Sequence, residues 1–363
     1  ALNAIHDSFF LSDTKRIHVF MIGAGLIGGT LLQQMEEQKD ILRDQNGLEI
    51  KVCGIANTKK MVFDENGIQL SDWKNILTSS NESSNPKLFV DRMISMNLAN
   101  TVFIDNTADT QIPELYKKIF EASISVATPN KIAASSVYDN YLSLKQLARK
   151  HNVEFLFETN VGAGLPVIST MRNLIHSGDR IIKIEAVLSG SVSFIFNNFD
   201  GTKPFSQLVN EAKELGYTEP DPRDDLSGAD VKRKITILAR EAGYAVNTDE
   251  VSIDSILPDN CMQATSVDAF FTILKQEDAY FNEMLTKARQ AGGSLRFIAK
   301  AENGKVSCGV ETVTTDSPFY NLGGSDNMIV FTTQRYKQRP LVVRGPGAGA
   351  EVTAAGIFAE IIS

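Results

Sequence analysis

Apolar residues form short continuous runs in the first half of the chain, and longer segments with helical spacing separate them. A strand whose residues are nearly all apolar is typical of a parallel sheet that helices cover on both faces. Alternation of such strands with helices predicts a doubly wound α/β domain of the Rossmann type. The predicted strands are residues 17–22, 49–57, 101–105, 123–127 and 153–157, and a helix is predicted at about 135–150.

The pattern changes in the second half, where apolar and polar residues alternate. Residues 181–188 have the period of a half-exposed strand. Asn303 and Gly304 mark a hairpin turn between residues 295–301 and 306–313. These alternating segments predict a second sheet that is largely antiparallel.

Helices accompany this second sheet. Residues 205–215 are amphipathic, and Gly216 is suited to terminate their helix. We expect helices to cover one face of the sheet and a second subunit to pair with the other face. Further strands are predicted at 327–334 and 341–344, and two helices within 244–294.

Composition narrows the class of protein. The 363 residues are enough for two domains, and a net charge of −8 argues against a nucleic-acid partner. The three cysteines are far apart and fit neither a disulfide framework nor a metal cluster, so we expect a cytoplasmic protein. No apolar run approaches the ~18 residues of a membrane span, and no signal peptide opens the sequence.

A glycine-rich turn joins the first predicted strand to a helix. Strand, G-x-G-x-x-G turn and helix in this order are the context in which the motif binds a dinucleotide, because the glycines let the backbone approach a pyrophosphate. A tight structural turn is the alternative. The motif comprises Gly23, Ala24, Gly25, Leu26, Ile27 and Gly28.

The second strand ends at Ala56 and Asn57, followed by Lys59 and Lys60. An NAD-specific fold usually has an acid there to hold the ribose hydroxyls. A neutral amide with cations nearby tolerates a 2′-phosphate, so we expect NADP to be preferred and NAD to remain possible.

Residues 216–234 contain five acids and four bases without being low in complexity. From Ser227, the expected N-cap, the pattern turns helical, and Asp230 and Lys234 leave the helix on the same side. Glu219 lies in the rigid loop before this helix. The stretch is either a solvated helix face with an acidic loop or a site for a small polar substrate, with Glu219 contacting an ammonium group.

The run GYTEPDPRDDLSGADVKRK, residues 216–234, resembles the signature of homoserine dehydrogenases. The resemblance implies that Glu219 holds the substrate amine and that Asp230 and Lys234 bind substrate and handle the proton. Thr128-Pro129-Asn130-Lys131 is similar to the segment that carries the family's second catalytic lysine, Lys131 here. Ser189 and Gly190 open a segment similar to the family's substrate pocket.

The resemblance also implies cofactor contacts for Thr107, Lys131, Gly216 and Gly349. It further implies a monovalent cation, expected to be sodium. Its ligands would be the carboxylate of Glu158 and the backbone carbonyls of Val161, Ala163 and Leu165, an oxygen-only set that suits a hard cation. A hinge between domains is the alternative reading of this glycine-containing segment, in which Pro166 is expected to begin a helix.

Residues 4–10 are similar to the linker before the dehydrogenase half of bifunctional aspartokinase–homoserine dehydrogenases. We expect a homodimer through the open face of the second sheet, and this resemblance adds the possibility of a higher oligomer through an N-terminal kinase half. By resemblance the last helix returns to the nucleotide-binding domain, which would comprise residues 1–157 plus 342–363. Residues 158–341 would form an inserted α+β domain for substrate binding and dimerisation.

The implied reaction is reversible hydride transfer between NAD(P)H and aspartate 4-semialdehyde, which gives homoserine in the pathway to threonine, methionine and isoleucine. Lys234 would move the proton, Lys131 would support the developing charge, and Asp230 would orient Lys234. Two crowded lysines would lower each other's pKa. The alternatives are a dehydrogenase for another amino-acid semialdehyde and a non-catalytic nucleotide-binding regulatory half of a larger protein.

Overall fold

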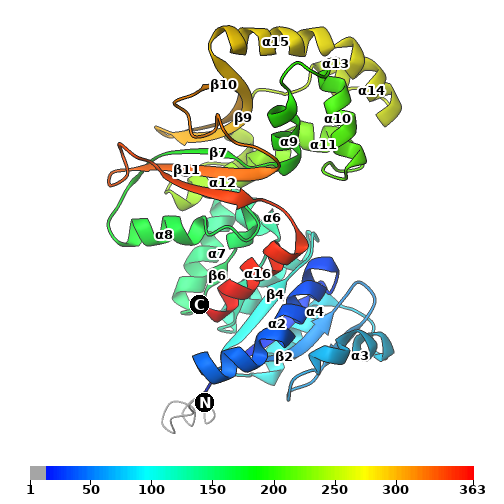
Figure 1. Cartoon of the computed structure of the whole chain (residues 1–363). Helices are drawn as coiled ribbons and strands as arrows, with labels where there is room; N and C mark the ends of the chain where they lie inside the picture. The colour runs from blue at the N-terminus through cyan, green and yellow to red at the C-terminus, as the bar shows by residue number, and fades with distance from the viewer. Residues whose placement is uncertain (1–13) are drawn as a thin grey trace. The chain divides into compact units, whose positions relative to one another are not determined.

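The computed structural model describes residues 14–363, so the predicted leader at 4–10 lies outside the described residues. The chain divides into two compact units (Figure 1). The first unit extends to Gly164 and resumes at Gly349, and the second is Leu165–Ala348. Each boundary lies seven residues beyond the predicted one. At the first boundary, the turn at Gly164 belongs to the first unit because it packs against the backbone of Val352 in the last helix.

The first unit contains a six-stranded sheet in the order β3-β2-β1-β4-β5-β6. Neighbouring strands in this sheet are parallel, except that β3 is antiparallel to β2. The hydrophobic pattern did not predict the short strand β3. The strands are β1 Lys15–Ile22, β2 Leu48–Ala56, β3 Met61–Phe63, β4 Thr101–Asp105, β5 Ser125–Ala127 and β6 Phe155–Leu156. The predicted Rossmann-type α/β architecture is confirmed.

Helices surround this sheet, and α16, the last helix, lies beside α2 (Figure 1). Ala354, Ile357 and Phe358 of α16 belong to the same core cluster as Val19 of β1. The helix predicted at about 135–150 is confirmed as α7, which begins at Tyr138 and is preceded by a separate short helix, α6, that ends at Ser135. The helices are α2 Leu26–Asn46, α3 Trp73–Ser79, α4 Pro86–Met96, α5 Tyr116–Glu121, α6 Lys131–Ser135, α7 Tyr138–Lys150 and α16 Ala350–Ile362, with 3-10 turns η1 Leu70–Asp72, η2 Ile112–Leu115 and η3 Glu158–Asn160.

The second unit contains the predicted, largely antiparallel sheet, in the order β12-β11-β7-β9-β10-β8. The hairpin at Asn303 and Gly304 is confirmed, and both residues have positive φ, 51° and 77°. Only β8 pairs in parallel, with β10. The strands are β7 Ile181–Val187, β8 Ser252–Ile253, β9 Gly293–Glu302, β10 Lys305–Thr314, β11 Asp326–Thr333 and β12 Leu341–Pro346.

Helices pack against this second sheet, and α9, α12 and α15 all contact β9. Val231, Ile235 and Leu238 of α12 are buried, as their spacing predicted. Pro166 does not begin α8, whose N-cap is Val167. The helices are α8 Ile168–His176, α9 Gly190–Asn198, α10 Phe205–Glu214, α11 Pro222–Leu226, α12 Ala229–Glu241, α13 Asp259–Met262, α14 Val267–Gln276 and α15 Asp278–Gln290, with 3-10 turn η4 Thr248–Glu250.

One face of the second sheet mixes apolar and charged side chains. Val187, Ile298 and Val330 belong to a small apolar cluster there. Beside it, Lys300 lies 3.6 Å from Glu185 and 2.6 Å from Glu311. These residues come from four neighbouring strands, so this face is continuous across the middle of the sheet.

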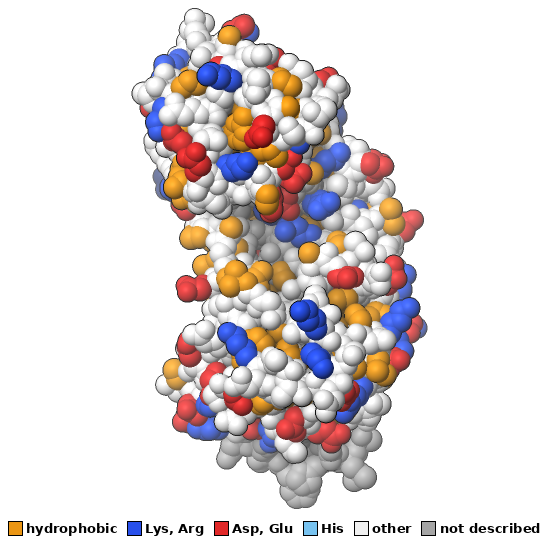
Figure 2. Space-filling model, turned by 90° about the vertical axis from the view of Figure 1, so that its right-hand side faces the viewer, with side chains coloured by type: hydrophobic (Ala, Val, Ile, Leu, Met, Phe, Trp, Pro, Cys, Tyr) orange, Lys and Arg blue, Asp and Glu red, His pale blue; other side chains and the backbone are white. Residues whose placement is uncertain are grey.

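Acidic and basic side chains are interspersed over the described surface that Figure 2 presents. Among residues 14–363, no helix is long and apolar enough to cross a membrane. The three cysteines are buried and unbonded, and burial raises the pKa of the Cys53 thiol to about 12.

Candidate active site

The three motif glycines of the turn between β1 and α2 differ in the space around them. Gly23 has a φ of 104°, and a Cβ there would lie 2.6 Å from the backbone of Asn106. A Cβ at Gly28 would lie 2.1 Å from the Gly23 carbonyl, whereas one at Gly25 would meet nothing within 4 Å. The open space at Gly25, beside the N-terminal amides of α2, fits the pyrophosphate of a dinucleotide. Ala24, exposed Leu26 and Ile27 complete the turn.

Asn57, after the end of β2 at Ala56, forms a turn with its own side chain. Its Oδ1 accepts hydrogen bonds of 2.8 Å from the amides of both Lys59 and Lys60. The ammonium group of Lys60 donates to the carbonyl of Ser80, while Lys59 is exposed. The two lysines therefore differ, and Lys59 is the one whose side chain extends into solvent beside this strand end.

Thr107 and Lys131 lie near the carboxyl ends of β4 and β5, the edge of a parallel sheet at which ligands bind. The hydroxyl of Thr107 donates 2.6 Å to Oδ1 of Asp105. Lys131 is the first residue of α6 and is half-buried, and Asn130 is the N-cap of that helix. The predicted positions of both residues at this edge agree with the structure.

In the second unit, Lys234 is buried on α12, with 8 % of its surface exposed. Its Nζ lies 2.8 Å from Oδ2 of Asp230, one helical turn earlier, and donates 2.7 Å to the carbonyl of Leu188. The predicted placement of Asp230 and Lys234 on one side of the helix is confirmed. The side chain of Asp230 is half exposed, so the pair joins a buried cation to a solvated carboxylate.

The predicted N-cap of this helix is wrong by one residue. Gly228, not Ser227, precedes α12, with a φ of 70°. A Cβ at Gly228 would lie 2.7 Å from Cδ1 of Ile253 and 3.0 Å from the ring of Phe297, so a larger residue would have to displace these side chains as well as adopt a strained positive φ. Ser227 ends α11 instead, and its hydroxyl still accepts from the amide of Ala229.

Asp225 was not predicted as a site residue, yet it joins the two segments expected to bind substrate. Its Oδ1 accepts 2.7 Å from Ser191, and its Oδ2 accepts 2.8 Å from the amide of Glu219. Ser191 in turn contacts Ser189, the N-cap of α9, whose first residue is Gly190. The acidic doublet at 224–225 was the available signal, but sequence alone does not distinguish its two members.

The remaining predicted residues lie at helix ends. Gly216 has a φ of 73° and terminates α10, as predicted, and it is exposed. Glu219 is also exposed, in the loop before α11. Gly349 is the N-cap of α16, with a φ of 125°. Gly349 and Lys131 belong to the first unit, whereas Gly216, Glu219 and Lys234 belong to the second.

Two family models match the chain. Residues 23–158 match the NAD-binding domain of homoserine dehydrogenase, and residues 166–362 match the homoserine dehydrogenase model itself. The chain belongs to the homoserine dehydrogenase family. The first unit is therefore the NAD-binding domain of this family, in agreement with the geometry of its glycine turn.

Named homoserine dehydrogenases are similar over the whole chain. A homoserine dehydrogenase of Schizosaccharomyces pombe is 38 % identical and is matched over 95 % of this chain and 94 % of its own. A chloroplastic bifunctional aspartokinase/homoserine dehydrogenase of Arabidopsis thaliana is 43 % identical over all of this chain but only 40 % of its own length. The chain thus spans about two fifths of this bifunctional relative.

Solved structures have the same fold. A Candida auris protein of unknown function is 35 % identical, with a TM-score of 0.87 over 96 % of this chain and 98 % of its own. A hyperthermophilic archaeal homoserine dehydrogenase in complex with NADPH has a TM-score of 0.73 over 96 % and 97 % of the two chains. At 24 % identity, the archaeal homoserine dehydrogenase supports the fold alone.

The segment predicted to hold a cation begins with Glu158, which is buried with 7 % of its surface exposed. Val161 and Ala163 are also buried, and Ala163 has a φ of 53°. Leu165 begins the second unit. No group of three histidine, cysteine or acidic side chains that could hold a metal occurs among residues 14–363. The chemistry of the expected ligands, one carboxylate and backbone carbonyls, suits a hard cation rather than zinc, and the carbonyl of Leu165 also accepts from the amide of Val167.

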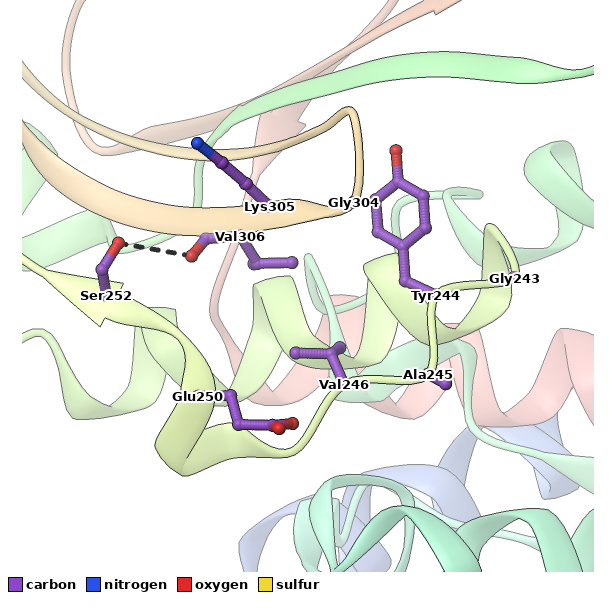
Figure 3. A pocket seen from close by; sticks show the side chains of 9 residues that line it. All are labelled: Gly243, Tyr244, Ala245, Val246, Glu250, Ser252, Gly304, Lys305 and Val306. Carbon is purple, nitrogen blue, oxygen red and sulfur yellow. Dashed lines mark hydrogen bonds between the residues drawn. The ribbon is translucent and has the colours of Figure 1, made fainter.

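A cavity of about 530 Å³ lies elsewhere in the second unit, between the segment after α12 and the β9–β10 hairpin (Figure 3). Tyr244, Glu250, Ser252 and Lys305 are among its lining residues. One oxygen of Glu250 accepts a hydrogen bond from the amide of Asn247, its own capping box. None of the predicted site residues lines this cavity.

Proposed function

We propose that this chain catalyses the NAD(P)-dependent interconversion of L-homoserine and L-aspartate 4-semialdehyde. The observation that carries the proposal is the buried Lys234, held 2.8 Å from Asp230 in a chain of this family. A buried amine beside a half-exposed carboxylate is suited to general acid–base chemistry. The reaction lies in the pathway to threonine, methionine and isoleucine.

Each side chain has a role in this proposal. Lys234 protonates the substrate oxygen as the aldehyde is reduced and accepts that proton in reverse. Asp230 orients Lys234 and the substrate hydroxyl. Lys131 supports the developing charge, and Glu219 binds the substrate amine near Ser189 and Gly190. The nicotinamide cofactor supplies or accepts the hydride when bound.

We also propose NADP rather than NAD as the preferred cofactor. The support is the amide of Asn57 where an acid would repel a 2′-phosphate, and the exposed Lys59 two residues later. The contacts proposed for the cofactor are the glycine turn, Ala56, Asn57, Thr107, Lys131, Gly216 and Gly349. A sodium ion on Glu158 and the carbonyls of Val161, Ala163 and Leu165 completes the proposed site.

The proposed assembly is a homodimer through the face of the second sheet that bears Val187, Ile298 and Val330. Val187, Ile298 and Val330 are themselves buried within the chain, so the surface proposed to pair with a second copy is formed by half-exposed residues beside them, such as Glu185 and Lys300. Relatives named as bifunctional suggest that a kinase half joins a larger assembly. A cytoplasmic location stays a prediction, because the plant relatives are named chloroplastic.

The test is NADPH oxidation by the purified chain with aspartate 4-semialdehyde, set beside glutamate 5-semialdehyde. We expect turnover with the first aldehyde and little with the second. Preference for glutamate semialdehyde would instead indicate a dehydrogenase for another substrate. Cofactor binding without turnover on either aldehyde would indicate a regulatory nucleotide-binding half.

A further inference from the structure

Asp105, at the end of β4, is a completely buried carboxylate. It takes no part in the reaction proposed above. Its two oxygens accept four hydrogen bonds. Oδ1 accepts from the amide and hydroxyl of Thr107, at 3.0 and 2.6 Å, and Oδ2 accepts from Tyr116 at 2.6 Å and from Asn130 at 3.0 Å. A buried charge is costly unless it is fully hydrogen-bonded, so this network is highly constrained.

Asn130 connects that carboxylate to Lys131. Its Nδ2 donates to Oδ2 of Asp105 and, at 2.9 Å, to the carbonyl of Asp109. Its Oδ1 accepts 3.1 Å from the amide of Ile132 and so caps α6. Both ends of the amide are therefore occupied, and Asp105 is the one side chain among the three groups that orient it. The residue that follows is Lys131.

Helix α6 has only five residues, Lys131–Ser135. A helix this short has little stability of its own, so its capping residue decides where it begins and in which direction its first side chain leaves. Because Asn130 is that cap, a change in its orientation would move Lys131 directly.

We propose that Asp105 is a positioning residue for Lys131 and acts through the amide of Asn130. The inference rests on the function proposed above, in which Lys131 supports the developing charge. The two oxygens of Asp105 then have separate tasks. Oδ1 holds Thr107, a proposed cofactor contact, and Oδ2 holds the cap of the helix that presents Lys131.

In the alternative, Asp105 only stabilises the edge of the sheet and does not position Lys131. A substitution of Tyr116 provides the matched control for this alternative. The Tyr116 hydroxyl donates to the same Oδ2, and its ring packs against Phe103, Phe120 and Phe155. Tyr116→Phe keeps this packing and leaves the bond from Asn130 to Asp105 in place. We expect this variant to lower Tm without changing kcat.

Asp105→Asn tests the proposal directly. Its Oδ1 can still accept from Thr107, but its new Nδ2 faces the Nδ2 of Asn130, so the cap must turn or move. Misplacing a reacting group by about 1 Å can cost roughly a hundredfold, and we expect kcat to fall about tenfold to a hundredfold. The dissociation constant of NADPH should rise by a smaller factor than kcat falls, because Thr107 keeps its acceptor at Oδ1 and only the contact proposed for Lys131 is displaced.

The swap, Asp105→Asn combined with Asn130→Asp, restores the hydrogen bond between positions 105 and 130 with the donor and the acceptor exchanged. The new Nδ2 at 105 donates to the carboxylate at 130, which still caps the amide of Ile132. We expect most of the lost kcat to return. It should not return completely, because the carboxylate at 130 repels the Asp109 carbonyl to which the Nδ2 of Asn130 donates in the wild type.

A second readout does not depend on turnover. The acylation rate of Lys131, measured by mass spectrometry without substrate, should rise in Asp105→Asn and return in the swap, with Lys150 as an internal reference. Wild-type turnover tests the proposed function separately. If Asp105→Asn does not fold, Asn130→Ser, which can cap α6 but loses Asp105, takes its place.

Two results would overturn the proposal. One is a folded Asp105→Asn or Asn130→Ser protein with wild-type kcat and unchanged labelling of Lys131. The other is equal loss of kcat in Tyr116→Phe and Asp105→Asn with no recovery in the swap, which would make Asp105 a structural anchor alone.

Discussion

The hydroxyl of Ser191 donates a hydrogen bond of 2.7 Å to Oδ1 of Asp225. The other carboxylate oxygen accepts from the backbone amide of Glu219, so one acid joins the start of α9 to the loop proposed to bind the substrate amine. Breaking this connection should loosen Glu219 without touching Lys234.

We therefore expect Asp225→Asn to raise KM for homoserine with a smaller effect on kcat. Hydrogen bonds to charged groups contribute about 1.5–3 kcal/mol, which corresponds to roughly tenfold or more in KM. Steady-state kinetics would check this, with Asp224→Asn as the control because that neighbouring side chain is exposed. Equal effects of both substitutions would contradict a specific role for Asp225.

Glu219→Ala should also act mainly on KM. The proposed contact with the ammonium group is distant from the hydride and is present in the ground and transition states alike. A charge-assisted bond predicts an increase in KM of roughly tenfold to a hundredfold. A collapse of kcat with an unchanged KM would instead assign Glu219 to the chemistry.

Lys234→Met should abolish nearly all turnover while the fold and cofactor binding persist. Met fills the same buried space, and Asp230 remains solvated because its side chain is half exposed. General acid–base steps contribute ~10²–10⁴-fold, so retention of more than about a tenth of the wild-type rate would refute the role of Lys234. Lys232→Met, two residues earlier on the same helix, is the matched control.

Asn57→Asp should change the preferred cofactor from NADPH to NADH. Asp retains the oxygen that accepts from the amides of Lys59 and Lys60, so the turn persists while a negative charge is added. That charge repels a 2′-phosphate and can bind the ribose hydroxyls. Dissociation constants of both cofactors at matched ionic strength decide this, and tighter binding of NADH by the wild type would reject the proposed preference.

His18 should make the protein less stable in mild acid. Burial lowers the pKa of His18, although its bond to the Ala99 carbonyl opposes this. Because the folded pKa lies below the unfolded value of about 6.5, the unfolded state binds more protons, and stability falls as the pH drops below about 6.5.

His18→Asn keeps a donor for Ala99 but does not titrate. Its denaturant midpoint should therefore change less than the wild-type midpoint between about pH 7.5 and pH 5.5. Burial raises the pKa of Asp105, so this residue also makes stability depend on pH. Its contribution is the same in both proteins and cancels when their midpoints are compared. Identical losses in the two proteins would exclude His18 as the cause.

Sequence patterns predicted the elements whose stability is local. The strand at 101–105 and the hairpin at Asn303 and Gly304 follow from apolar runs and turn residues that act over a few positions. The pairing of Asp230 with Lys234 follows from helical spacing alone. These features depend on neighbours along the chain, so their signal is present in any short window.

Other features depend on contacts between distant segments. Strand β3 has three residues and owes its place to pairing with β2. Gly228 caps α12 because a side chain would collide with Ile253 and Phe297, which no pattern around 228 reveals. The bonds of Asp225 to Ser191 and of Asp105 to Asn130 span 34 and 25 residues, respectively.

The contribution of α16 to the first unit has a consequence for synthesis of the protein on the ribosome. Ala354, Ile357, Phe358 and Ile361 complete a core whose other members precede residue 157. While the second unit is being translated, the first exposes the apolar surface that α16 will cover. The nascent nucleotide-binding unit must therefore wait for the last helix to complete its core, and until then its exposed apolar surface is a site for chaperone binding or aggregation.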